Sequence, residues 1–234
     1  MRSKFGLLAA ALGLAVVQAA AAADMPLKAA TAAIPFNWTG LYVGATAGYV
    51  FGSSQHCDPP GSRFCTNSFA VDGFIGGGTL GYNWQWSNWV AGLETDFSGA
   101  SARGSTTSLR GSFSCGTAVL ICRTQLDWFG TVRGRLGAAY DRFLPYVTGG
   151  FAYGRLYADL GVPATSNSDT RGGWTMGGGI EYALAPQHWS AKLEYLYVHL
   201  GNLFYDTARL CGNLTCTAVH NDFNIVRLGV NYRF

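Results

Sequence analysis

The residues from position 224 to the C-terminus alternate between apolar and polar side chains, and the last residue is aromatic. The apolar set comprises Val226, Leu228, Val230, Tyr232 and Phe234. The positions between them include Arg227 and Arg233, so the segment has a period of two, which predicts a β-strand with one apolar and one polar face. A strand that ends on Phe234, with arginines on its polar face, is typical of the closing strand of a membrane β-barrel.

The composition favours a chain that lies in a membrane. Only 12% of its 234 residues are charged, whereas a globular domain has about 25%. Beyond the N-terminal segment, no apolar run approaches the roughly 18 residues that a spanning helix needs. Because only helices and closed barrels satisfy their backbone hydrogen bonds in lipid, the pattern predicts a barrel.

The N-terminal segment has the features of an export signal. Arg2 and Lys4 form a basic region, residues 5–17 are apolar, and three alanines precede Asp24 as a cleavage site. We therefore expect a signal peptide at 1–23, a periplasmic lead-in at 24–39 and an outer-membrane barrel at 40–234. Loss of Arg2 and Lys4 leaves a nearly neutral chain, which gives no electrostatic reason to expect a nucleic-acid partner.

Eight segments of the chain carry the two-residue period. They are 40–51, 69–86, 89–99, 124–140, 146–158, 172–184, 189–200 and 224–234. Their connections alternate between long and short, and an even strand number with that alternation is typical of bacterial outer-membrane barrels. The fold class we expect is all-β, an eight-stranded antiparallel up-and-down transmembrane barrel, with long loops outside and both termini periplasmic.

The charged residues distinguish this barrel from a soluble one of the lipocalin type, whose apolar face would point inward. Eight ionic side chains fall on the strand face opposite the aromatic residues, so we expect a lumen charge network. They are Glu94, Asp96, Arg133, Arg135, Glu181, Lys192, Glu194 and Arg227. Aromatic residues occur where predicted strands end, as expected for interfacial girdles. This set is Trp84, Trp86, Trp89, Trp128, Tyr146, Trp174, Trp189 and Phe234.

The six cysteines fall as neighbouring pairs in three predicted external loops. We expect the disulfides Cys57–Cys65, Cys115–Cys122 and Cys211–Cys216, since an exported protein is oxidised by default. Each should stabilise the fold by about 2–3 kcal/mol. Metal binding is the alternative, but no pair has the C-x-x-C spacing.

Three motifs carry a family resemblance, at 36–44, 192–201 and 226–234. Together they resemble the small outer-membrane β-barrel proteins of alphaproteobacteria, the porin-like, outer-membrane immunogenic protein family. The resemblance covers essentially the whole mature chain. It implies eight strands, insertion by the barrel assembly machinery that reads Phe234, and a role in the cell envelope. His199 departs from the family pattern, which has an acidic residue there.

The sequence leaves several functions open. The first is a structural barrel that contributes to envelope integrity and presents surface loops as an antigen or to a host ligand, with outer-membrane lipids and lipopolysaccharide as partners. The second is a narrow porin for small solutes, although opposed lumen charges should pair and block an eight-stranded interior. The third function is haem binding through His56, His199 and His220, although the sequence contains no haem-binding motif. No nucleophile motif flanks the histidines, so we expect neither an enzyme nor a cofactor.

Overall fold

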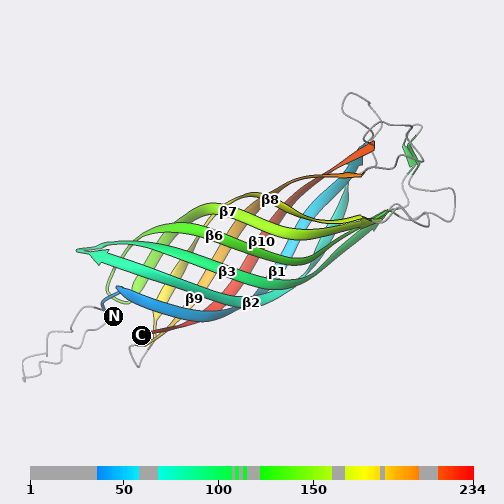
Figure 1. The fold of residues 1–234 in the computed structure, drawn as a ribbon. Coiled ribbons are helices and arrows are strands. Elements are labelled where there is room, and N and C mark those ends of the chain that lie inside the picture. Colours follow the sequence, from blue (N-terminus) through cyan, green and yellow to red (C-terminus); the bar gives the residue numbers. More distant parts are fainter. Residues whose placement is uncertain are drawn as a thin grey trace, which may run out of the picture. The chain divides into compact units, whose positions relative to one another are not determined.

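The computed structural model describes residues 36–57, 68–106, 109–110, 113–114, 122–159, 167–184, 188–205 and 216–234. Within these residues, eight long antiparallel strands close a barrel in the order β1-β10-β9-β8-β7-β6-β3-β2 (Figure 1). Their bounds are β1 Gly40–Cys57, β2 Phe69–Trp86, β3 Trp89–Thr106, β6 Cys122–Ala138, β7 Phe143–Asp159, β8 Asn167–Ala183, β9 Trp189–Tyr205 and β10 Cys216–Arg233. The predicted fold class is confirmed.

A separate two-stranded sheet lies between β3 and β6 in the chain and consists of β4 (Leu109–Arg110) and β5 (Phe113–Ser114). None of the described residues belongs to a helix that is long and apolar enough to cross a membrane.

The two ends of the barrel differ in how the strands are joined. At one end, short connections follow β2, β6 and β8, and β1 begins opposite the last residues of β10, with Tyr42 paired to Arg233. Ser87 and Asp141 lie in two of these connections with φ of 53° and 54°, a left-handed conformation that small polar residues tolerate in turns. We call this the short-turn end, and the opposite end the long-connection end.

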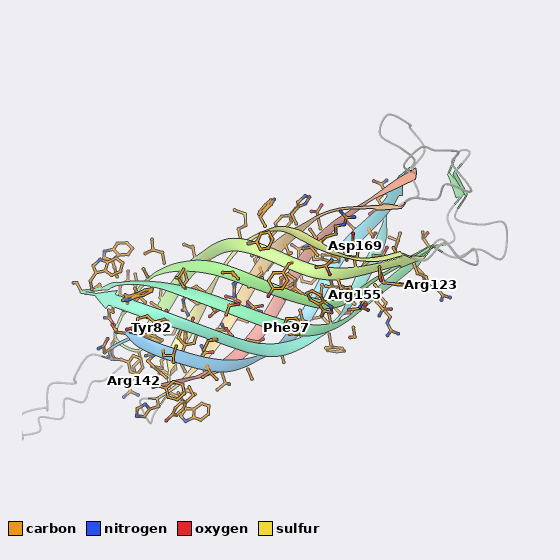
Figure 2. All side chains as sticks on the ribbon, in the orientation of Figure 1. Tyr82, Phe97, Arg123, Arg142, Arg155 and Asp169 are labelled. Carbon is orange, nitrogen blue, oxygen red and sulfur yellow. The ribbon has the colours of Figure 1, made fainter. Side chains whose placement is uncertain are left out.

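The apolar faces of the strands point outward, as the sequence predicts. Phe74, Leu93 and Val147 are 59–74% exposed, whereas Glu94 is only 4% exposed. Figure 2 shows Tyr82 and Phe97 projecting from the barrel wall. A barrel with apolar side chains outside and ionic groups inside is suited to lipid on its outer surface.

The strands extend further toward the long-connection end than the sequence predicts. β1 continues to Cys57 instead of ending at Phe51, β3 continues to Thr106, and β10 begins at Cys216. The added residues are mostly polar, which is why they read as loop in the sequence. They remain in the sheet because the backbone ladder continues, for example between Gln55 of β1 and His220 of β10.

Candidate functional site

The inside of the barrel is filled by three successive layers of side chains. The layer at the short-turn end is a buried apolar cluster of Trp38, Val90, Ala139, Leu144 and Ala183. Trp38 is fully buried, its backbone N–H donates to Gln85 Oε1 at 2.7 Å, and its indole Nε1 donates to the Asp141 carbonyl at 3.2 Å. The residues just before β1 therefore pack against the barrel end, which periodicity alone did not indicate for the lead-in.

The middle layer, which we call the charged layer, contains all eight ionic side chains that the sequence assigned to the lumen. It consists of Glu94, Asp96, Arg133, Arg135, Glu181, Lys192, Glu194 and Arg227, each at most 4% exposed. The side chains come from β3, β6, β8, β9 and β10. Four cations face four carboxylates, so the layer carries no net formal charge.

Arg133 of β6 is the hub of the charged layer. Its guanidinium contacts Glu94 at 2.5 Å, Asp96 at 3.0 Å and Glu194 at 3.0 Å. Its Nε donates to the Thr131 hydroxyl, which in turn donates to Asp96. With no exposed side-chain surface, this guanidinium is compensated by carboxylates instead of water, as a buried charge requires.

Arg227 and Lys192 connect the same carboxylates to the opposite side of the barrel wall. Arg227 Nε lies 2.7 Å from Glu194 and its Nη2 lies 3.0 Å from Asp96. Lys192 Nζ lies 2.9 Å from Glu94. Each of these three carboxylates therefore has at least two cationic neighbours, and the layer forms one network across the interior.

A second group of polar contacts lies nearer the short-turn end, around Arg135. This guanidinium lies 2.7 Å from Glu181 and stacks 4.0 Å from the centre of the Tyr146 ring. Tyr146 is only 6% exposed and donates its hydroxyl to Glu194 at 2.9 Å. The expectation that Tyr146 belongs to an interfacial girdle is therefore wrong, because its even register position on β7 turns it into the lumen beside Leu144.

The third layer, which we call the apolar layer, fills the interior between the charged layer and the long-connection end. On β9, Glu194 is followed toward that end by Leu196 and Val198, and on β10 Arg227 is followed by Ile225 and Phe223. The full cluster is Val50, Phe69, Val71, Ile75, Ala102, Leu126, Phe129, Ala152, Leu156, Ala158, Leu196, Val198, Leu200, Phe223 and Ile225. These side chains are at most 9% exposed, so the layer is a packed core.

The two-residue period did not predict the apolar layer, because the inward positions of the strands were expected to hold polar residues and glycine. A signal was present in β9, where Leu196, Tyr197 and Val198 are consecutive. Such a continuous apolar run is typical of a strand whose two faces are both covered by apolar surroundings. The inward face therefore changes from ionic to apolar along β9 and β10.

The remaining predicted site residues lie apart from these layers. Phe234 is 68% exposed, and its backbone N–H donates to the Leu41 carbonyl at 3.0 Å, which joins the last residue to β1. Among the cysteines, Cys57, Cys122 and Cys216 are terminal strand residues, not loop residues as expected. Their side chains, and the whole of Cys65, Cys115 and Cys211, lie outside the described residues, so the three disulfides stay predictions.

His199 lies on the outer surface of β9 near the long-connection end. Its Nδ1 is 2.7 Å from an Asp222 carboxylate oxygen, which also accepts the Tyr197 hydroxyl at 3.0 Å. His199, at which the family resemblance implied an acidic residue, thus contacts an acid on the neighbouring strand. In the described part of the chain, no group of three or more His, Cys, Asp or Glu side chains is arranged to hold a metal ion.

Comparisons with known proteins agree with this architecture. The family model described as "Outer membrane protein beta-barrel domain" matches residues 7–234. The 31 kDa outer-membrane immunogenic protein of Brucella melitensis is 40% identical, and the match covers 85% of this chain and 85% of that protein. The 22 kDa outer membrane protein of Rhizobium leguminosarum bv. viciae is 28% identical, with 85% and 79% covered.

Solved structures show the same likeness of fold. The crystal structure of the outer membrane protein OprG from Pseudomonas aeruginosa matches with a TM-score of 0.52 at 13% sequence identity, covering 85% of this chain and 99% of that one. At this identity the likeness concerns the barrel alone.

Proposed function

The chain belongs to the bacterial family of the outer membrane protein beta-barrel domain, and on this premise we propose that it is a closed structural barrel that stabilises the outer membrane and presents its long connections at the cell surface. The observation that carries the proposal is the filled interior. The charged layer is neutral, each of its charged groups has an ion-pair partner, and the apolar layer packs directly beside it. Ions or small polar solutes would have to cross both layers.

The charged layer opposes conduction because its side chains are held by several partners at once. Opening a passage would separate Arg133 from three carboxylates and Arg227 from two. Breaking even one such buried pair costs about 3–5 kcal/mol. The apolar layer adds a second barrier, since water and ions gain no polar partners from side chains such as Phe129 and Leu196.

The same contacts support an architectural role over a catalytic one. The carboxylates of the charged layer are the obvious acid or base groups of the interior. Each of them forms an ion pair with arginine or lysine. General acid or base work requires a group that can exchange its proton with a substrate in reach. A non-enzymatic barrel is therefore the function that the interior supports best.

For orientation, we place the short-turn end in the periplasm and the long-connection end at the cell surface, as in barrels with short periplasmic turns and long external loops. We further propose that outer-membrane lipids surround the apolar wall, that the barrel assembly machinery reads the exposed Phe234, and that the long connections meet surface ligands.

Single-channel recording tests the closed barrel. The refolded protein is inserted into a planar bilayer in concentrated KCl, and insertion is verified by the shift in gel migration between heated and unheated samples. We expect flat current traces for the unmodified protein. Stable unitary steps whose conductance changes in the Glu94→Gln variant would contradict the proposal and support the alternative, a narrow porin.

Haem is the other alternative to exclude. A titration that follows the Soret band is expected to show no saturable binding, and saturation at one haem per chain would contradict the purely structural role.

A further inference from the structure

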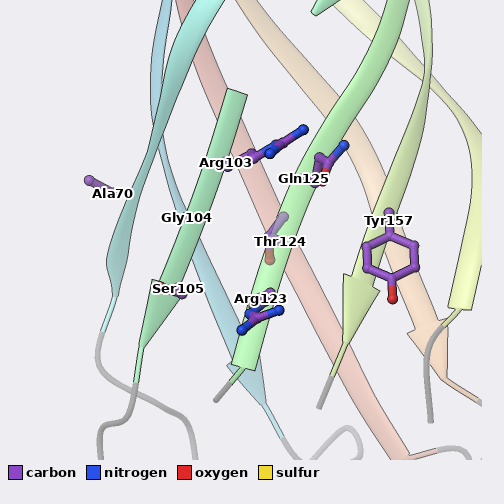
Figure 3. A pocket seen from close by; sticks show the side chains of 8 residues that line it. All are labelled: Ala70, Arg103, Gly104, Ser105, Arg123, Thr124, Gln125 and Tyr157. Atoms are coloured by element: carbon purple, nitrogen blue, oxygen red, sulfur yellow. The ribbon is translucent and has the colours of Figure 1, made fainter. Parts of the chain in front are cut away.

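A polar groove opens on the barrel wall close to the long-connection end. It has a volume of ≈ 530 Å³ and is formed by β2, β3, β6 and β7 (Figure 3). Its lining residues are Ala70, Arg103, Gly104, Ser105, Arg123, Thr124, Gln125 and Tyr157. Figure 2 shows the labelled Arg123 and Arg155 at this end of the barrel, away from Tyr82. We call this feature the arginine groove.

The two arginines of the groove face outward for different reasons. Arg103 follows the regular alternation of β3, in which the even-numbered positions from Val90 to Ala102 point inward. Arg123 follows a bulge that reverses the alternation of β6, so that Leu126 and Thr124 point inward in place of the odd-numbered positions. Such irregularities commonly re-aim side chains at barrel rims. Arg103 and Arg123 thus lie on the outer surface, two rungs apart on the β3–β6 ladder.

The strands β2 and β3 approach each other closely behind the groove. A Cβ added at Gly104 would lie 2.2 Å from the Ala70 carbonyl oxygen and 2.7 Å from the side chain of Val71, which is buried inside the barrel. The inward side of this position therefore has no room for a side chain.

Among the described arginine side chains of this rim, Arg103 and Arg123 differ from the others in having no described counter-charge. Arg155 lies 3.9 Å from Asp127, and Arg171 lies 2.8 Å from Asp169. Within the part of the chain that the structure describes, the side chain of neither groove arginine makes an ion pair or a hydrogen bond. Two unpaired guanidinium groups at one groove create a site that attracts anions.

Two of the acidic residues around the groove are already engaged. Asp72, opposite Arg103 on β2, accepts the Tyr49 hydroxyl. Asp127 accepts the Gln125 amide at 2.6 Å in addition to facing Arg155. Asp159 stands opposite Arg123 in the β6–β7 ladder, and its side chain lies outside the described residues.

The groove lies at the height of lipid headgroups. At about 3.4 Å per residue and about 45° of tilt, β6 from Trp128 to Ala138 spans about 24 Å of barrel height, close to the apolar band of such barrels. Trp128 contacts Phe97 and Tyr153, with ring centres 5.5 and 6.0 Å away, which forms an aromatic border. Gln125 and Arg123 then lie about 7 and 12 Å beyond this border.

We propose that the arginine groove binds a phosphate group on the headgroup of a glycolipid in the outer leaflet. The inference rests on the membrane placement proposed above. Arg103 and Arg123 supply paired N–H donors whose planar geometry matches phosphate oxygens, and Ser105 and Tyr157 add hydroxyl donors at its edge. The acyl chains of the same lipid would lie along the aromatic border of Phe97 and Trp128.

The test compares two double variants that change the charge equally. Arg103→Gln with Arg123→Gln removes the unpaired arginines, whereas Arg155→Gln with Arg171→Gln removes the paired ones from the same rim. Each protein is inserted into phosphatidylcholine nanodiscs doped with bisphosphorylated or dephosphorylated lipid A, and bound lipid is counted by native mass spectrometry. We expect the groove variant to bind the bisphosphorylated lipid at least about tenfold more weakly, and the paired variant to change less than about twofold.

Several outcomes would overturn the inference. Equal losses in both double variants would mean that binding follows rim charge in general, and equal retention of both lipids would mean that phosphate is not recognised. A parallel titration with inorganic phosphate in detergent, if it showed tight binding that depends on the groove arginines, would assign the site to a free anion. Failure of the unmodified chain to enter nanodiscs would instead contradict the membrane placement itself.

Discussion

Replacing Arg133 with methionine should destabilise the barrel strongly. The change keeps an unbranched side chain in place but removes the guanidinium that contacts Glu94, Asp96 and Glu194 at 2.5–3.0 Å. The charged layer then has three cations against four carboxylates, all buried. Each of the three carboxylates retains one close cation, either Lys192 or Arg227.

The expected loss follows from that arrangement. Removal of one partner of a buried ion pair costs about 3–5 kcal/mol, and the remaining cations place this variant near the lower end, at about 3 kcal/mol. Adding Glu194→Gln restores neutrality with three cations and three carboxylates. The double variant should therefore lose less than the sum of the single changes, by about 1–3 kcal/mol.

Equilibrium urea unfolding in lipid vesicles, followed by tryptophan fluorescence, measures these differences in the free energy of unfolding. Arg155→Met is the matched control, because this arginine side chain is 50% exposed and lies 3.9 Å from its acidic partner, so the loss should stay below about 1 kcal/mol. An Arg133→Met variant as stable as the control, with additive behaviour in the double variant, would refute a dry, mutually compensated charged layer.

Three further predictions concern the remaining layers and the connections. Trp38→Ala empties the buried end of the barrel and should lower the free energy of unfolding by about 3–5 kcal/mol, whereas an unchanged urea midpoint would show that this residue does not anchor the end. Gly173→Ala should lower the free energy of unfolding by about 1–3 kcal/mol or more, since the new Cβ would lie 1.9 Å from the His199 carbonyl oxygen. The control Gly99→Ala should be neutral, because its Cβ would meet nothing within 4 Å. Equal refolding yields of the two variants would contradict this packing. If the three neighbouring cysteine pairs are oxidised, peptide mapping by mass spectrometry will find each pair linked, and reduction should lower stability by about 2–3 kcal/mol per bridge; free thiols throughout would contradict the pairing.

The outward surface of the barrel could be predicted from the sequence almost residue by residue. Two-residue alternation depends only on the geometry of an extended strand, and contact with lipid requires every outward position in the membrane to be apolar. Leu93 beside Glu94 and Leu136 beside Arg135 obey it. The ends of the strands were harder to predict, because ladder hydrogen bonds continue through polar residues such as Gln55 regardless of side-chain hydropathy.

The sequence by itself determined the strand period, the eight-stranded closure and which ionic residues face inward. These follow from local alternation and from the high energetic cost of a charged side chain in lipid. The tertiary structure alone decided which carboxylate meets which cation. Arg133 and Glu194 are 61 residues apart, and only barrel closure brings them together. The structure also decided that Trp38 and the apolar layer fill the interior, and that a bulge in β6 turns Arg123 outward beside Arg103. Such contacts depend on strand register, which no local pattern encodes.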